Sequence, residues 1–194
     1  MRESTGTALD EFLPAPDARE RHAVVVRAPA DLVYDVARHF DLRSIPLVHA
    51  IFRLRARLMG ARADARQGGG RLDTGSLMRM GWGVLAEEPG RRLIAGAVCQ
   101  PWRADVVFTP VAPHQFASHA VPDSVKIAWT LEAEPLDRTR TRLATETRAV
   151  GTDPAARARF RRYWRWARVG IVAIRWLLLP AIRREAERRW GARP

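Results

Sequence analysis

Five histidines and a single cysteine are the side chains of this sequence best suited to metal binding or nucleophilic catalysis. The histidines form no HExxH pattern and no pair at the spacing of zinc ligands. Cys99 has no base beside it in the sequence that would lower its pKa, so we expect a buried structural thiol. The sequence therefore predicts no metal site, no cofactor and no catalytic nucleophile.

Seven tryptophans are the second chemically distinctive group. Each offers a large apolar surface with one N–H donor, and can either fill a core or line a cavity that holds a flat or long apolar ligand. The two roles are compatible, because cavity walls are also core. The residues expected to line such a cavity are Trp82, Trp102, Phe108, Trp129, Thr145, Thr147, Phe160, Trp164, Ile171 and Ile174.

Four polar residues are candidates for anchoring the polar end of a ligand: Arg103, His119, Glu146 and Arg148. His119 falls in an expected loop, where it could act as an acid or base at the mouth of a cavity. Alternation along the strand favours Thr145 and Thr147 as inward-facing. Glu146 and Arg148 would then form an outward ion pair of little energetic value, and would anchor a ligand only if they faced inward.

The elements that must position these residues follow from the hydrophobic pattern. The Val-rich segment 21–28 favours a strand, and Pro29 suits the first turn of a helix over 30–39. Apolar residues three and four apart predict a second helix over 43–60, followed by a Gly-rich loop at 61–71. Strands are expected at 81–88, 91–99, 102–111, 125–134 and 140–150, with a short helical turn within 113–120.

A long helix is expected over 154–190, with Asp153 as its N-cap and Pro154 as its first residue. Pro180 lacks an amide hydrogen, so we expect the helix to kink or end near it. The main apolar stripe consists of Phe160, Trp164, Ala167, Ile171, Ile174 and Leu178.

A second apolar stripe on this helix consists of Val169, Val172, Trp176 and Leu179. A helix packed on one sheet cannot bury both stripes. The second stripe therefore needs another cover: a second copy of the chain, the N-terminal arm or a membrane interface.

Four stretches carry a resemblance to bacterial proteins of one superfamily: Val24–Val36 (VVVRAPADLVYDV), Gly81–Gly96 (GWGVLAEEPGRRLIAG), Trp129–Arg148 (WTLEAEPLDRTRTRLATETR) and Asp153–Trp164 (DPAARARFRRYW). Together with the element order, they resemble the helix-grip fold of the START and Bet v 1 superfamily, also called the SRPBCC family. The resemblance implies an α+β fold in which a curved antiparallel sheet wraps around a long C-terminal helix, with two short helices after the first strand. It also implies an apolar cavity between sheet and helix, and no fixed catalytic motif.

Composition sets the class of protein. The chain has 194 residues, of which 47% are hydrophobic and 28% charged, as is typical of a globular protein. We expect residues 1–19 to form a loosely ordered N-terminal arm and residues 20–194 a single domain. The sequence has neither an apolar N-terminal segment nor an uncharged apolar run long enough for a transmembrane helix, so we expect a cytoplasmic protein, with membrane association left open.

The charge is uneven. The net charge is +12, and residues 154–194 hold twelve arginines against two glutamates. Such a basic helix is either a solvated face or a surface for an anionic partner. Nucleic acid is a weak candidate, because Phe160 and Trp164 fall on the expected core stripe and no nucleic-acid-binding motif is present.

These observations favour binding or transport of a small hydrophobic ligand, of the lipid, polyketide or isoprenoid class, between the sheet and the last helix. The resemblance implies an alternative, a cyclase- or aromatase-like enzyme that uses the same cavity without a metal. A third hypothesis is a membrane-surface or regulatory protein that acts through the basic helix.

Overall fold

The computed structural model describes residues 7–41, 44–60 and 74–192, so the loop expected at 61–71 lies outside the described residues. The elements in chain order are β1 (Ala18–Val26), α1 (Ala30–His39), α2 (Pro46–Leu58), α3 (Thr74–Arg79), β2 (Gly83–Glu88), β3 (Arg92–Cys99), α4 (Pro113–Phe116), β4 (Val125–Pro135), β5 (Thr141–Gly151) and α5 (Pro154–Gly191). The expected helix over 30–39 coincides with α1. The short helix α3 was not anticipated.

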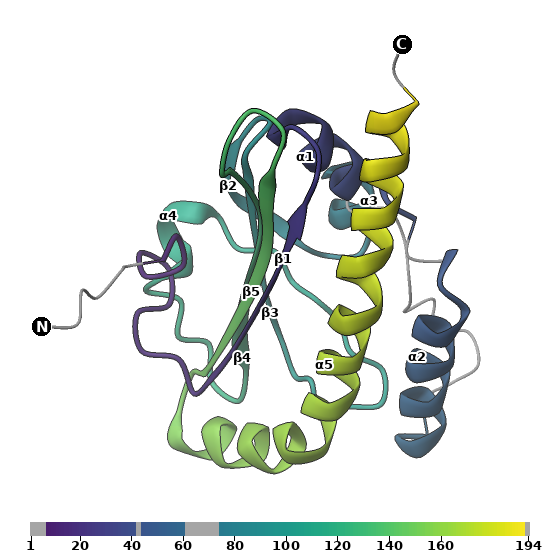
Figure 1. Ribbon diagram of the computed structural model, residues 1–194. Helices are drawn as coiled ribbons and strands as arrows, with labels where there is room; N and C mark the ends of the chain where they lie inside the picture. Colours follow the sequence, from purple (N-terminus) through teal and green to yellow (C-terminus); the bar gives the residue numbers. More distant parts are fainter. Residues whose placement is uncertain (1–6, 42–43, 61–73, 193–194) are drawn as a thin grey trace, which may run out of the picture.

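The strands form one antiparallel sheet in the order β1-β5-β4-β3-β2. The sheet is curved, and α5 runs along its concave side with α2 beside it (Figure 1). This arrangement confirms the α+β fold class predicted from the sequence, a curved antiparallel sheet against a long C-terminal helix. The two helices expected after the first strand are α1 and α2, and the short α3 follows them before β2. None of the helices among the described residues combines the length and apolarity needed to cross a membrane.

The larger apolar cluster fills the concave face at the α1 end of the sheet. Apolar side chains alternate along the strands, so each strand contributes every second residue to this face. The cluster joins Leu93, Leu131 and Leu143 of the sheet to Val33 and Val36 of α1 and to Leu179, Ile182 and Ala186 of α5. It fixes the C-terminal half of α5 against the sheet.

A smaller cluster lies at the other end of the same face. Phe160 of α5 packs on Ala18, Val125 and Ala149, with the rings of Trp102, Tyr163 and Trp164 around it. The helix begins as expected, since the Asp153 carboxylate accepts a hydrogen bond of 2.8 Å from the amide of Ala156. Its first turns cross the end of the sheet before the helix turns to run along the concave face (Figure 1).

Two expectations about elements were wrong. Residues 102–111 form no strand and share only an isolated bridge between Thr109 and Val98. Pro101 directly before the segment and Pro110 within it cannot donate to a ladder, and the ring of Phe108 stacks on Trp82 instead. The helix does not end near Pro180 either: α5 continues to Gly191, and its marked bend in Figure 1 lies in its N-terminal half.

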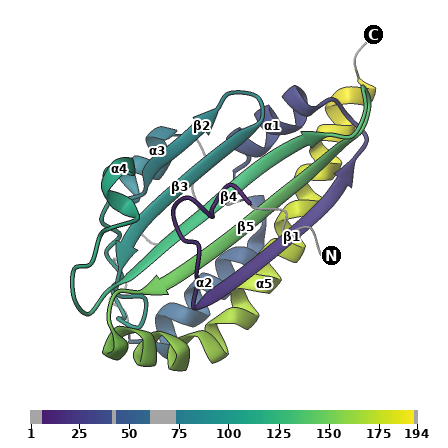
Figure 2. The same ribbon diagram turned by 90° about the vertical axis from the view of Figure 1, so that its left-hand side faces the viewer.

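The N-terminal arm packs closely where a loosely ordered segment was expected. Residues 7–17 cross the convex face of the sheet, in front of the strands in Figure 2. Leu9, Phe12 and Leu13 are buried there against Leu85, Ile94, Phe116 and Ala128. The convex face carries apolar residues that need a cover, and the arm supplies it.

Candidate functional site

A polar row crosses the concave face between the two apolar clusters. In the strand register, Glu20 of β1 lies opposite Thr147 of β5, which lies opposite Trp129 of β4. Two residues further along β1, His22 lies opposite Thr145 of β5. Residues paired across antiparallel strands point to the same face, so these side chains share the face that α5 covers. Thr145 and Thr147 thus have the inward orientation that alternation predicts.

Arg175 of α5 reaches this row. Its guanidinium donates hydrogen bonds to the hydroxyl of Thr147 and, at 3.4 Å, to the carbonyl oxygen of Glu20. The residue is only 8% exposed, and burial lowers the pKa of Arg175 to about 10. A guanidinium has five N–H donors, so donors remain beyond these two contacts for an acceptor oxygen of a ligand.

No carboxylate forms an ion pair with Arg175 among the described residues. The nearby carboxylate of Glu20 is held by Arg168 instead. The charges of Glu20 and Glu146 offset part of the cost of burying this cation, but the lowered pKa of Arg175 shows that burial outweighs them, so an incoming anion or carbonyl oxygen is favoured.

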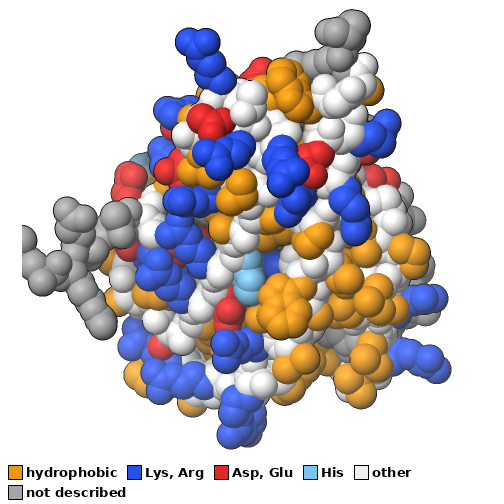
Figure 3. All heavy atoms as spheres, viewed as in Figure 1, with side chains coloured by type: hydrophobic (Ala, Val, Ile, Leu, Met, Phe, Trp, Pro, Cys, Tyr) orange, Lys and Arg blue, Asp and Glu red, His pale blue; other side chains and the backbone are white. Residues whose placement is uncertain are grey.

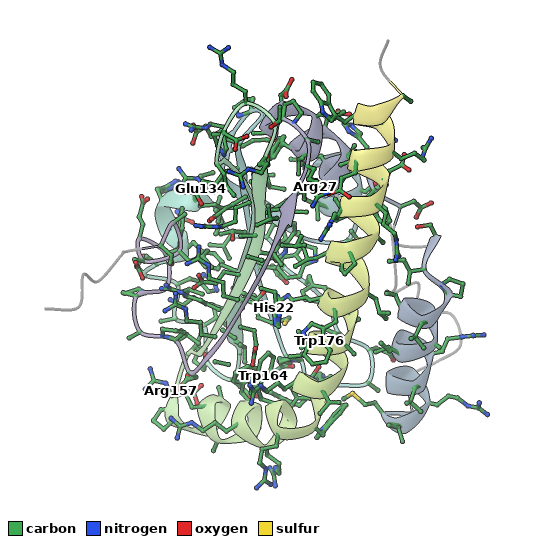
Figure 4. The ribbon with its side chains drawn as sticks, viewed as in Figure 1. His22, Arg27, Glu134, Arg157, Trp164 and Trp176 are labelled. Carbon is green, nitrogen blue, oxygen red and sulfur yellow. The ribbon has the colours of Figure 1, made fainter. Side chains whose placement is uncertain are left out.

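His22 lies beside this cation. Its Nε2 atom is buried, has no hydrogen-bond partner among the described residues, and stands 3.7 Å from Oε2 of Glu20. Burial, and then the positive charge of Arg175, lower the pKa of His22, while Glu20 acts in the opposite direction. The imidazole is therefore neutral near pH 7 and can exchange a proton or a hydrogen bond with a ligand. Figure 4 shows His22 on the side of β1 that faces α5, where Trp164 and Trp176 are labelled.

Aromatic rings border the row on both sides. Trp82 stacks on Phe108 with ring centroids 4.7 Å apart and meets the edge of Trp129 at 6.1 Å. Gly81 makes this stack possible, since its φ is +85° and a Cβ atom there would lie 2.1 Å from the carbonyl oxygen of Phe108. At the opposite side, the rings of Phe160 and Trp164 are 5.5 Å apart.

The middle of the concave face is less tightly covered than its two ends. Ile127, Trp129, Thr145 and Thr147 face α5 yet remain half-buried. Ile171 and Ile174 are half-buried on α5 itself. Of the ten residues expected to line a cavity, Trp129, Thr145 and Thr147 lie on the concave face and Phe160, Trp164, Ile171 and Ile174 lie on α5. Trp102 and Phe108 lie in the segment between β3 and α4, and Trp82 directly precedes β2.

The structure removes Glu146 and Arg148 from the set of anchors for this face. They lie on the convex face, 3% and 2% exposed, and the Arg148 Nε atom donates to Oε1 of Glu146 at 2.7 Å. Arg148 also donates to the Asp10 carboxylate at 2.6 Å and the Leu13 carbonyl at 2.7 Å. The reason is the alternation of β5: once the two threonines face α5, the residues between them must face the arm.

The other two polar candidates are also distant from the row. Arg103 is exposed in the segment that follows β3. His119 follows α4, whose Phe116 is buried in the apolar cluster of the convex face. Neither residue comes from an element that contributes to the polar row.

Sequence reasoning predicted Thr145 and Thr147 as site residues but missed His22 and Arg175. His22 alternates with Val24 and Val26 along β1, and this parity alone marks it as inward-facing. Arg175 is the single charged residue within the apolar run from Val169 to Leu179. This pattern indicates an arginine that is buried with specific polar partners.

No family model matches this sequence, and no curated protein matches it. Among solved structures, the chain is similar to the Zhui aromatase/cyclase from Streptomyces sp. R1128, with 16% identity over 89% of this chain and 94% of that chain and a TM-score of 0.30. It is similar to a Deinococcus radiodurans protein, with 17% identity, 79% and 98% coverage and a TM-score of 0.32. It is also similar to CalU16 from Micromonospora echinospora, with 17% identity, 90% and 97% coverage and a TM-score of 0.28. Values this low transfer neither a ligand nor an activity to this chain.

Proposed function

We propose that this protein binds a small hydrophobic molecule with an oxygen-bearing end, on the concave face between the sheet and α5. The observation that carries the proposal is Arg175, a cation that is 8% exposed within the apolar run from Val169 to Leu179, with N–H donors left over and no paired carboxylate among the described residues. Aromatic and aliphatic side chains on both sides of the polar row would desolvate the body of the ligand.

The chemistry of the row limits the ligand class. A carboxylate or a carbonyl oxygen would accept hydrogen bonds from Arg175, and His22 Nε2 would supply or accept one more. A pure hydrocarbon would leave these polar groups unpaired at a cost, so lipid, polyketide or isoprenoid molecules with an acidic or keto end fit best.

The test is a binding titration with cis-parinaric acid and with the corresponding alcohol, followed by the fluorescence of the polyene. We expect Arg175→Met to weaken binding of the acid about tenfold or more, because a charge-assisted hydrogen bond is lost, and to change binding of the alcohol little. Arg184→Met, at an exposed position of the same helix, is the matched control and should bind both probes as the native chain does.

Thr147→Val provides a second variant if Arg175→Met folds poorly, since it removes only the hydroxyl that orients the guanidinium. Native mass spectrometry of the purified protein, with extraction of any bound molecule, identifies the natural ligand class. Equal affinity of the native chain and Arg175→Met for the acid, or no binding of either probe, contradicts the proposal.

A second candidate function is a cyclase-like reaction at the same place, favoured by the buried and unpartnered Nε2 of His22. A neutral imidazole there could take a proton from a carbon next to a ketone while Arg175 stabilises the charge that develops on the oxygen. In D₂O, such proton removal exchanges the hydrogen on the carbon next to the ketone of a long-chain 4-oxo acid for deuterium. The exchange occurs because the base returns a deuteron from the solvent to that carbon. If deuterium exchange is faster with the native chain than with His22→Gln, the result supports an enzyme. If the two exchange rates are equal, the result supports a binding protein without this activity.

A further inference from the structure

An exposed apolar surface lies on the outer side of α2 and α5, away from the polar row. On α2, Leu47, Leu54 and Leu58 are 55%, 58% and 70% exposed, and they fall within one narrow arc of the helix. On α5, Val169 and Trp176 are 72% and 70% exposed. Leu179, expected in the same stripe, is instead buried in the core. Figure 3 shows hydrophobic side chains gathered over these two helices.

The two helices form one continuous surface. Ile51 of α2 approaches α5 so closely at Gly170 that a Cβ atom there would lie 3.2 Å from Cγ2 of Ile51. Met59, just after α2, and Tyr163 and Trp166 of α5 line the same hollow of about 230 Å³. We call the surface made by Leu47, Leu54, Leu58, Trp166, Val169 and Trp176 the α2–α5 patch.

Cations border the patch, and acidic residues are absent from the parts of α2 and α5 that carry it, since Glu185 and Glu187 lie near the far end of α5. Residues 44–60 and 154–184 contain no Asp or Glu. Arg161, Arg162 and Arg165 line a second hollow of about 310 Å³, and Arg162 also lines the first hollow together with Trp166. Among the described residues, Arg162 and Arg165 form no ion pair. Arg53 and Arg57 add exposed cations on α2.

These charges decide between possible occupants. A second copy of this surface would bring arginines against arginines, which disfavours a symmetric dimer. A nucleic acid would pair with the cations and leave the leucines exposed to water. An anionic bilayer satisfies both, since leucine and valine side chains enter the acyl boundary, tryptophan suits the interface and arginines meet lipid phosphates.

We propose that the α2–α5 patch docks this protein on the surface of a bilayer rich in anionic lipids. The protein lies on the membrane and does not cross it. The proposal does not depend on the ligand site, because none of the patch residues belongs to the polar row.

The experiment is co-sedimentation of the purified full chain with vesicles of phosphatidylcholine alone or with phosphatidylglycerol added. We expect binding to the mixed vesicles that weakens as salt increases, and little binding to phosphatidylcholine alone. Leu54→Ser with Leu58→Ser should lower the partition coefficient roughly tenfold, because two insertable side chains are lost. Val107→Ser with Val121→Ser, at exposed positions outside the patch, is the matched control and should bind normally.

The charge contribution has its own pair of variants. Arg162→Gln with Arg165→Gln should reduce binding to the mixed vesicles roughly tenfold. Arg91→Gln with Arg138→Gln removes the same charge at the hairpin turns and should have little effect. If the two double arginine variants lose vesicle binding equally, the proposal is overturned. It is also overturned if the native chain binds equally well with and without phosphatidylglycerol.

A solution dimer that Leu54→Ser with Leu58→Ser disrupts, without vesicle binding by the native chain, also overturns the proposal and identifies a second copy as the occupant. Arg175→Met should sediment with vesicles as the native chain does, so failure of the ligand proposal and failure of the membrane proposal give different results.

Discussion

At the residue scale, His22 links the candidate site to acid stability. Burial lowers its pKa in the folded chain, so below about pH 6.5 the unfolded chain binds a proton that the folded chain does not. The free energy of unfolding is therefore highest above that pH and falls as the pH decreases toward the pKa of the folded state. Urea titrations at about pH 7.5 and about pH 5.5 should show a smaller stability difference for His22→Gln than for the native chain. An unchanged difference would assign the acid sensitivity to other groups.

Arg148 acts at the same scale on the opposite face. Its guanidinium, 2% exposed, joins Glu146 to Asp10 and Leu13 of the arm. Arg148→Met should lower the free energy of unfolding by about 3 kcal/mol, because Glu146 loses a buried partner and the arm loses its attachment. Arg142→Met, on the same strand in an exposed pair with Glu134, should cost less than about 1 kcal/mol. Similar losses for the two variants in urea unfolding would show that Arg148 has no special role.

At the element scale, strands and helices with strong periodicity could be predicted from the sequence. The structure of the segment 102–111 and the environments of Arg175 and His22 depend on tertiary contacts that the sequence pattern does not show. The alternation of β4 and β5 and the spacing of apolar residues in α5 report on burial directly, and those elements form as expected. The segment 102–111 has the composition of a strand, but its rings pack on Trp82 and Phe160 rather than beside β3. Arg175 and His22 were missed for a similar reason, since only the contact between α5 and β1 gives them a shared environment.

The arm is the element whose role depends most on tertiary contacts. Phe12 meets Phe116 edge to face at 6.3 Å and covers the convex apolar residues. Phe12→Ala should cost about 3 kcal/mol in urea unfolding, because a buried ring is replaced by a cavity. Val25→Ala, at a 44% exposed position of β1, should change stability by less than about 0.5 kcal/mol. A loss for Phe12→Ala as small as that of the control would mean that the arm is only loosely attached.

At the scale of the whole molecule, α5 contributes to both apolar clusters of the concave face, through Phe160 at one end and Leu179 and Ile182 at the other. A ligand held between them should therefore stabilise both together, by about 2.7 kcal/mol when its free concentration is a hundred times its Kd. Thermal unfolding followed by near-UV and by far-UV circular dichroism should shift by the same amount on addition of ligand, because the two clusters unfold in one step. Phe12→Ala should have a lower unfolding temperature without ligand. The added ligand should raise that temperature by the same amount as in the native chain, since the arm lies on the other side of the sheet. If ligand moves only one of the two midpoints, tertiary packing and secondary structure are not lost in one step, which contradicts joint stabilisation of the two clusters.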